Sequence, residues 1–346
     1  MQLLFGILAF LSATLLFGVV PVLPEWEIVY LYVTSLVFRF TYAAFDVSQN
    51  ALVSLLPSPT GSAGLFVTVK LFASSLGRLA AAVLVAWAVA TEGDLLADAK
   101  TLAVISIPFA ITVYALSCAK PGRTAPAHMP STFEFGHLPI AALALPVVAT
   151  VCEVGLLGLT GRLMPLFPKE AGGASPSSLI VAMVCGTVVG PWLGFVAGRR
   201  RVPRLVLIAV ASACATWSAV NLLHPVGVGT GLVMAALYGT GLAVLTNFVW
   251  EQVSTVVRDH AARHGTRIDA PAFAVITTAI KIAIALSAAL FGLFLDAFRQ
   301  GSSGSVQSIT ILLVVGGSGA AVALVLSELW RKPRLLTGNP QVTQVA

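Results

Sequence analysis

Two charged and two amide side chains interrupt a long apolar stretch near the start of the chain, residues 38–56: Arg39, Asp46, Gln49 and Asn50. Arg39, Asp46 and Asn50 are seven and four positions apart, so they lie on one face of a helix. A carboxylate near the middle of a membrane helix costs at least a few kcal/mol, and it normally faces a bundle interior or a water-filled pathway. Two interpretations of Asp46 follow. It binds a cation, a proton or a solute hydroxyl, or it forms a structural ion pair with Arg39 or with a lysine on a neighbouring helix.

Three cations stand inside apolar stretches further along the chain: Lys70, Arg78 and Lys281. Lys281 lies about eleven residues after the start of its apolar stretch at 270, with apolar neighbours on both sides. Its ammonium group is too far from an interface to reach water, so it needs a carboxylate or a wet cavity. Lys70 is about a third of the way into its stretch, where tilt of the helix would let its side chain reach an interface. Arg78 is expected to pair with an acid on a neighbouring helix.

Three more polar residues occur in later apolar stretches. Glu153 stands mid-stretch and is interpreted either as a proton-relay carboxylate or as an acid that joins two helices. Asn247 and Glu251 are one helical turn apart near the end of another stretch. The four cysteines and five histidines show no metal-ligand spacing, so we expect no metal and no cofactor.

The composition indicates which class of protein carries these residues. The chain has 346 residues, of which 58% are hydrophobic and 10% charged, and its mean hydropathy is +0.94. A soluble domain has about a quarter charged residues. The sequence therefore predicts an all-α polytopic membrane protein. Its net charge of +6 does not favour nucleic-acid binding, because the basic residues sit in short loops. Ten spans are expected, at about 2–20, 29–56, 64–91, 101–119, 138–160, 177–198, 204–223, 229–256, 270–297 and 307–330.

Basic residues concentrate in alternate loops, which the positive-inside rule places in the cytoplasm. We therefore expect a protein of the cell inner membrane with both termini in the cytoplasm. A Pro-rich connection lies between the fourth and fifth expected spans. The expected organisation is an N-terminal helical bundle of about four spans, a cytoplasmic linker, a C-terminal six-helix bundle and a cytoplasmic tail, at 1–119, 120–137, 138–330 and 331–346.

Three stretches resemble a known family: FDVSQNALVSLLP from Phe45, VKLFASSLGRLAA from Val69, and VVRDHAARHGTRIDAPAFAVITTAIKIAIALSAALFGLFLDAF from Val256. The chain resembles the major facilitator superfamily and, within it, the glycoside–pentoside–hexuronide:cation symporters, the family of the melibiose carrier. The first two stretches are similar to the fourth and fifth helices of that family. The third is similar to the connection between its tenth and eleventh helices, followed by a membrane lysine.

The resemblance implies a major facilitator-type two-bundle fold with about ten transmembrane helices, four plus six. It also implies roles for the polar residues. Asp46, Lys70 and Lys281 would line one central cavity, and the set expected to bind solute or ion is Asp46, Gln49, Asn50, Lys70, Glu153 and Lys281. The residues expected to act as gating or structural charges are Arg39, Arg78, Asn247, Glu251, Asp259 and Arg267.

The function that this resemblance implies is secondary active transport of a small polar solute by alternating access, with a proton or sodium ion as the coupling ion. No enzyme motif occurs in a suitable setting, so we expect no enzyme. The expected partners are membrane lipids and the solute, and no nucleic acid is expected.

The family's first two helices have no counterpart in this chain, and three alternatives stay open. The chain is a transporter, a non-transporting scaffold or subunit derived from one, or a truncated gene product. A separately encoded N-terminal helix pair could complete it. Because the family's first two helices are missing, we expect that the chain alone does not catalyse ion-coupled sugar uptake, and that two added N-terminal helices stabilise it.

Overall fold

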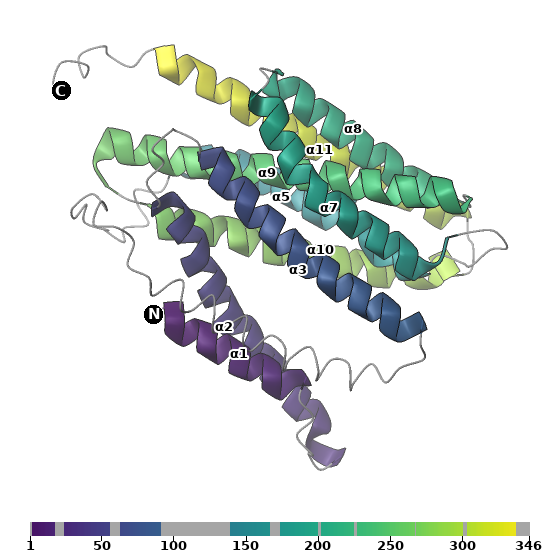
Figure 1. The fold of residues 1–346 in the computed structure, drawn as a ribbon. Helices are drawn as coiled ribbons and strands as arrows, with labels where there is room; N and C mark the ends of the chain where they lie inside the picture. Colours follow the sequence, from purple (N-terminus) through teal and green to yellow (C-terminus); the bar gives the residue numbers. More distant parts are fainter. Residues whose placement is uncertain are drawn as a thin grey trace.

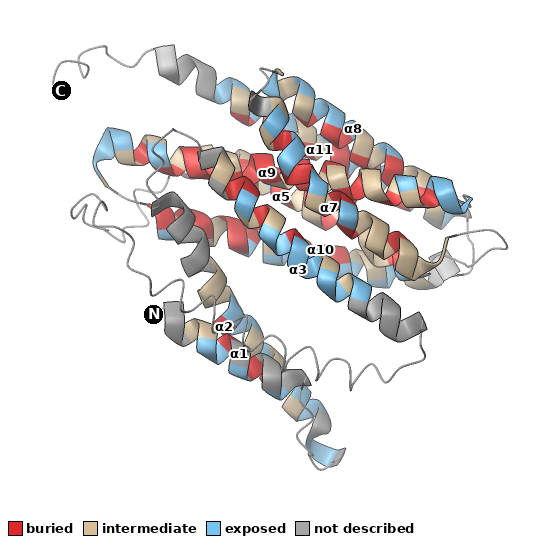
Figure 2. Ribbon diagram, viewed as in Figure 1, coloured by how far each residue is buried: buried red, intermediate tan, exposed pale blue. Residues whose placement is uncertain are grey.

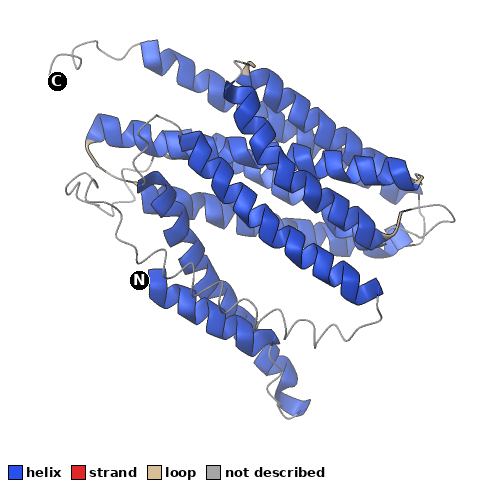
Figure 3. Cartoon of the chain, viewed as in Figure 1, coloured by secondary structure: helices blue, strands red, loops and turns tan. Residues whose placement is uncertain are grey.

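The protein, studied as a computed structural model, folds into a bundle of long helices (Figure 1). The structure describes residues 2–17, 24–55, 63–90, 139–166, 174–199, 202–224, 227–266, 268–299 and 303–336. Within these residues every regular element is helical (Figure 3). This confirms the predicted all-α class.

The N-terminal part contains α1 (Gln2–Phe17), α2 (Glu27–Leu55) and α3 (Ala63–Ala90). The second part contains a broken first span, built from α5 (Ile140–Thr150), a π-helix (Val151–Leu157) and α6 (Leu159–Leu163). Five long helices complete the chain: α7 (Pro176–Arg199), α8 (Arg204–Leu222), α9 (Val228–His264), α10 (Asp269–Arg299) and α11 (Ser303–Leu336).

Seven of the described segments are long and apolar enough to cross a membrane: 28–46, 140–163, 176–197, 204–222, 228–264, 269–295 and 306–330. Large apolar side chains cover their outer surfaces, such as Tyr32, Phe40 and Leu293, which are more than 70% exposed. Such a surface is suited to lipid rather than water. The chain is therefore a multi-pass membrane protein. The expected spans 2–20 and 64–91 coincide with α1 and α3, whereas the expected span 101–119 lies outside the described residues.

Two helices run further than the hydropathy of the sequence predicts. The span expected to end at 256 continues in α9 to His264, because Val257 and His260 still face the bundle and stay buried. Gly265 then stops the helix with a left-handed φ of 64°, a conformation that favours glycine. Similarly, α11 continues to Leu336, so the expected tail from 331 begins as helix.

Helix α9 forms the centre of the second part, and most of its length is buried (Figure 2). It packs against α7 and α8, while α11 packs against α8 and against the broken span. Glycines permit the closest of these crossings. A Cβ atom added at Gly186 of α7 would overlap the carbonyl oxygen of Ala236, and one added at Gly239 of α9 would overlap that of Met183. Small residues at a helix crossing let the two backbones approach closely.

The N-terminal helices reach the second part by two routes. Helix α1 packs on α2, where Ser12 and Thr41 are joined by a hydrogen bond of 3.2 Å. Helix α2 then packs against α10, whereas α3 packs against α7 and α9. In Figure 1, α1 and α2 lie below the main group of helices, and α3 runs beside α7. The membrane charges of α2 and α3 are thereby brought to the boundary between the two parts.

Candidate functional site

Asp46 lies on α2 with a half-buried side chain. One turn earlier on the same helix is Tyr42, and the charges of Asp46 and Arg78 both act electrostatically on its ring hydroxyl. Arg39 is exposed. Gln49 and Asn50 belong to α2, but their side chains lie outside the described residues, so the expected polar stripe is described only up to Asp46.

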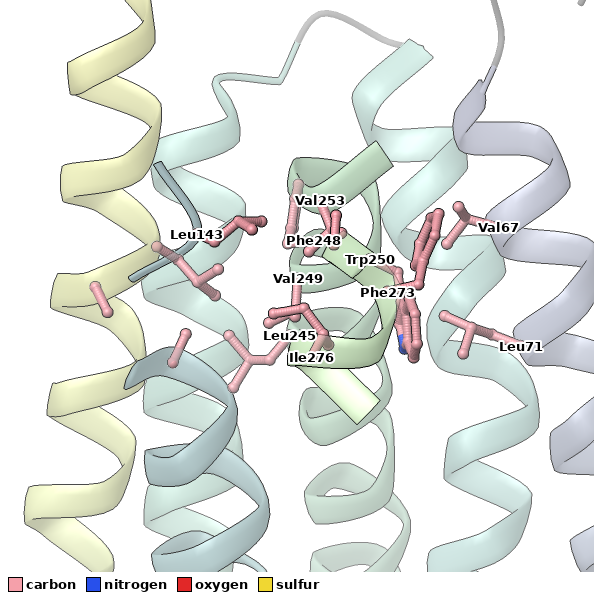
Figure 4. Close-up of a cluster of buried hydrophobic side chains, with 14 of the residues drawn as sticks. Val67, Leu71, Leu143, Leu245, Phe248, Val249, Trp250, Val253, Phe273 and Ile276 are labelled. Atoms are coloured by element: carbon pink, nitrogen blue, oxygen red, sulfur yellow. The ribbon is translucent and has the colours of Figure 1, made fainter. Parts of the chain in front are cut away.

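Lys70 is half-buried on α3, at the contact of this helix with α9. Its Nζ atom lies 4.2 Å from the centroid of the Trp250 ring, which is the geometry of a cation–π contact. Trp250 stacks in turn on Phe273 of α10, with 5.8 Å between the ring centroids. Lys70 also interacts electrostatically with Asp46. Figure 4 shows the apolar support of this arrangement, with Val67 and Leu71 of α3 beside Trp250 and Phe273.

Lys281 approaches the same region from α10. Its Nζ atom lies 5.0 Å from the centroid of the Tyr42 ring, and its side chain is exposed. Arg78 is also exposed and donates a hydrogen bond of 3.3 Å to Ser75 of its own helix. Lys281 of α10 thus contacts an aromatic ring of α2, and Lys70 of α3 contacts an aromatic ring of α9. Both contacts cross the boundary between the two parts of the chain, and Asp46 interacts electrostatically with Tyr42 and Lys70.

Glu153 stands apart from this group, inside the π-helix of the broken span. It is only 4% exposed, and Thr246 of α9 forms a short hydrogen bond with its carboxyl group. The π geometry is visible in the backbone, where Gly158 donates a hydrogen bond of 2.8 Å to the carbonyl oxygen of Glu153, five residues earlier. Single π turns inside α-helices are rare and frequently mark functional positions.

Asn247 and Glu251 have different surroundings although they lie on one face of α9. The side chain of Asn247 is 4% exposed and lies against Gly194 of α7. Within the described residues its Oδ1 atom has no hydrogen-bond partner. Glu251 forms an ion pair with Arg204 of α8, and Arg204 reaches Glu328 of α11 at 3.7 Å. Glu251 is thus part of a charged contact that joins three helices.

Asp259 lies at the far end of α9, beside a cavity of about 280 Å³ between α5, α9 and α11. Its lining includes His260, Arg263, His264 and Trp330. Arg267, the expected partner of this region, lies outside the described residues.

The sequence interpretation missed the partners of these charges. The sequence alone does not single out Tyr42, Trp250 or Thr246. They lie beside charged side chains only because helices far apart in the sequence pack together. Arg204 is one of the basic residues at the loops that indicate orientation, and it also pairs with two acids. One signal was present in the sequence, since the large aromatic residue Trp250 directly precedes the acid Glu251.

Three comparisons place the chain among known proteins. Residues 141–327, more than half of the chain, match the family model described as MFS/sugar transport protein. No curated protein matches the sequence. Among solved structures, the fold is similar to that of the Escherichia coli fucose:proton symporter in a variant form, with a TM-score of 0.66 and 14% identity over 94% of this chain and 83% of that chain.

These matches agree with an all-helical polytopic fold of the major facilitator type. The residues matched by the family model span the broken segment and α7 to α10, together with most of α11. The chain therefore belongs to the MFS/sugar transport protein family and is a transporter of the major facilitator superfamily.

Proposed function

We propose that the protein is a secondary active transporter that couples a cation to the movement of a small polar solute, and that Asp46, Lys70 and Lys281 form part of its binding site. The observation that carries this proposal is that two membrane lysines contact aromatic rings across the boundary between the two parts, Lys281 with Tyr42 of α2 and Lys70 with Trp250 of α9. Charged residues inside membrane segments mark solute and ion pathways more often than lipid-facing surfaces.

The position of these charges suits alternating access. Transporters of this kind hold their solute between two groups of helices that rock against each other. Helices α2 and α3 belong to the first group and α9 and α10 to the second, and the contacts Lys70–Trp250 and Lys281–Tyr42 cross the boundary. A solute that displaced either lysine from its aromatic ring would therefore change how the two groups contact each other.

A sugar is the proposed solute, and a proton or a sodium ion is the proposed coupling ion. The proposal is supported by the family description, by the sugar:proton symporter with a similar fold, and by the resemblance of three stretches to the glycoside–pentoside–hexuronide:cation symporters. A carboxylate beside cationic and aromatic groups can bind sugar hydroxyls through charge-assisted hydrogen bonds. Gln49 and Asn50 would extend this polar face, and Asp259 and Arg267 would act at a gate.

The proposed location is the inner membrane, with both termini in the cytoplasm, because basic residues concentrate in alternate loops. The proposed organisation is a first bundle within 1–119 and a six-helix bundle within 138–330, joined by the linker 120–137.

Sugar binding can be tested by thermal unfolding of the purified full chain in detergent, with a panel of monosaccharides and disaccharides that includes L-fucose and melibiose. A ligand that binds only the folded state stabilises it, by about 2.7 kcal/mol when its concentration is about 100 times Kd. We expect at least one sugar to raise the unfolding temperature, and we expect Lys70→Met to abolish that rise.

The matched control is Arg258→Met, which replaces an exposed cation whose one hydrogen-bond partner among the described residues is Thr255 of its own helix. This variant should respond to the sugar as the unchanged protein does. If no sugar stabilises the protein, or if Lys70→Met responds fully, the proposed binding site is wrong. Absence of any response would favour the non-transporting scaffold.

A further inference from the structure

The Glu153 carboxyl group is buried in a part of the bundle that supplies it with very little polarity. Its side chain is 4% exposed, and among the described residues Thr246 is its one hydrogen-bond partner. An ionised carboxylate needs several donors or a cation to offset the loss of water. One hydroxyl group provides too few donors to stabilise an ionised Glu153.

The hydrogens available at Thr246 point to a protonated acid. The Thr246 Oγ1 atom lies 3.0 Å from the carbonyl oxygen of Leu242, which can only accept a hydrogen bond. A threonine hydroxyl has one hydrogen, so a well-aligned hydrogen bond to Leu242 leaves no second hydrogen for an ionised Glu153. Both contacts are satisfied together if Glu153 carries a proton and donates it to Thr246, which then donates to Leu242.

Among the described side chains, the neighbouring helices supply no cation in place of that proton. Arg162 of α6 donates to Ser287 and to the carbonyl oxygen of Ile284, at 3.0 and 3.1 Å. Lys281 of α10 faces Tyr42, and Arg204 of α8 pairs with Glu251 and Glu328. The other titratable groups on the described parts of the elements packed against the π-helix are uncharged at neutral pH or lie toward the helix ends: Cys152, Cys214, Tyr238, Arg258, Asp259, His260, Arg263, His264 and Asp269.

Tyr238 of α9 is the titratable neighbour that interacts electrostatically with Glu153. Its hydroxyl group donates a hydrogen bond of 2.8 Å to the carbonyl oxygen of Leu157, at the end of the π-helix. It is therefore already committed as a donor, and it would repel rather than stabilise a negative charge on Glu153 if it ionised.

The π-helix gives this carboxyl group a way to move. Successive residues of an α-helix are about 100° apart around the axis, since 3.6 residues complete one turn. Conversion of the π turn into an α turn would shift the register by one residue and rotate Glu153 relative to Thr246. A rotation of that size would break the hydrogen bond and change the access of the carboxyl group to water.

We propose that Glu153 is a proton-binding site in the second group of helices, and that its bound proton is donated to Thr246. The site takes up a proton from water and releases it when the π-helix changes register. A role of this proton in coupling to solute movement rests on the proposed transport function, whereas the binding of the proton to Glu153 does not.

Infrared difference spectroscopy of the purified full chain tests the bound proton without any solute. At neutral pH we expect a carbonyl stretching band of a carboxylic acid that is lost in Glu153→Gln. In Thr246→Val the band should move to higher frequency, because the acid loses its acceptor. The matched control is Thr240→Val, which removes a hydroxyl bonded to Ala236 on the same helix and should leave the band unchanged.

Transfer into heavy water tests whether the proton exchanges, as a binding site for protons requires. We expect the band to shift to lower frequency within the experiment. The proposal is overturned if the carboxylic-acid region of the infrared spectrum is identical in the unchanged protein and in Glu153→Gln. It is also overturned if the band does not shift in heavy water, since the proton then does not exchange. If Glu153→Gln does not fold, an unshifted band in Thr246→Val overturns it equally. None of these results depends on whether a sugar is transported.

Discussion

At the scale of single residues, Arg204 shows how a charge at a helix start can hold several helices together. It reaches Glu251 of α9 and Glu328 of α11, whose side chains are 19% and 12% exposed. Removal of the guanidinium group would take a cation away from two partly buried carboxylates. A half-buried ionic contact of this kind is costly to break from one side.

We predict that Arg204→Ala lowers the free energy of unfolding by about 1 kcal/mol, between the small contribution of an exposed ion pair and the larger cost of leaving a buried polar partner unsatisfied. Thermal unfolding in detergent measures it. Arg258→Ala is the matched control, because that exposed guanidinium bonds only within α9. The double replacement Glu251→Gln and Glu328→Gln should recover part of the loss in the Arg204→Ala background. Equal stability of Arg204→Ala and the control would count against the contact.

The sequence identified the charges of the candidate site but not what they touch. A charged side chain inside an apolar stretch is recognisable from the sequence, because its insertion into a membrane costs free energy whichever way it points. This identified Asp46, Lys70, Glu153 and Lys281. Their partners depend on how helices cross, and a one-residue rotation of α9 would replace Trp250 beside Lys70 with another side chain. The nearest neighbours of these charges could therefore not be predicted.

At the scale of elements, hydropathy predicted where the long helices lie, since it reports the length of chain that lipid can surround. It could not predict the continuation of α9 past 256, because polar residues there face water while one face stays buried. Nor could it predict the π-helix, which differs from an α-helix by one residue per turn and leaves no trace in composition.

The crossing of α7 and α9 gives the clearest prediction for an element. Gly186→Ala should destabilise the protein by about 1–3 kcal/mol, the typical cost of overpacking, because the new methyl group meets the Ala236 carbonyl oxygen. Gly77→Ala is the control. A Cβ atom there meets nothing within 4 Å, and alanine favours a helix more than glycine does. If the unfolding temperature falls equally for both variants, close packing at this crossing is not the cause of the lost stability.

At the scale of the whole molecule, orientation in the membrane remains a prediction from the loops. We expect the connection between α7 and α8 to be cytoplasmic and the connection between α8 and α9 to be external. In a cysteine-free background, an impermeant thiol reagent applied to intact cells should label His224→Cys and spare Arg200→Cys. Strong labelling of position 200 with no labelling of position 224 would reverse the orientation.

The division of the molecule into two rocking groups depends on the same boundary that holds the proposed site. Asp46 is a carboxylate that interacts electrostatically with both Tyr42 and Lys70, so in the proposed function it is the group through which a cation would be coupled to the solute. Replacing it by asparagine keeps the shape and polarity of the side chain and removes the charge.

Gradient-driven uptake by the purified full chain in proteoliposomes tests this claim most directly. The probes are the radiolabelled sugars of the binding panel, each with an imposed proton or sodium gradient. We predict that one gradient drives accumulation of at least one sugar and that Asp46→Asn abolishes this accumulation. The control is Glu25→Gln, which removes an exposed carboxylate outside the membrane helices and should leave the accumulation unchanged. Equal accumulation by Asp46→Asn and by the unchanged protein would contradict a coupling role for Asp46. If neither gradient drives uptake of any sugar, the proposed transport function is contradicted.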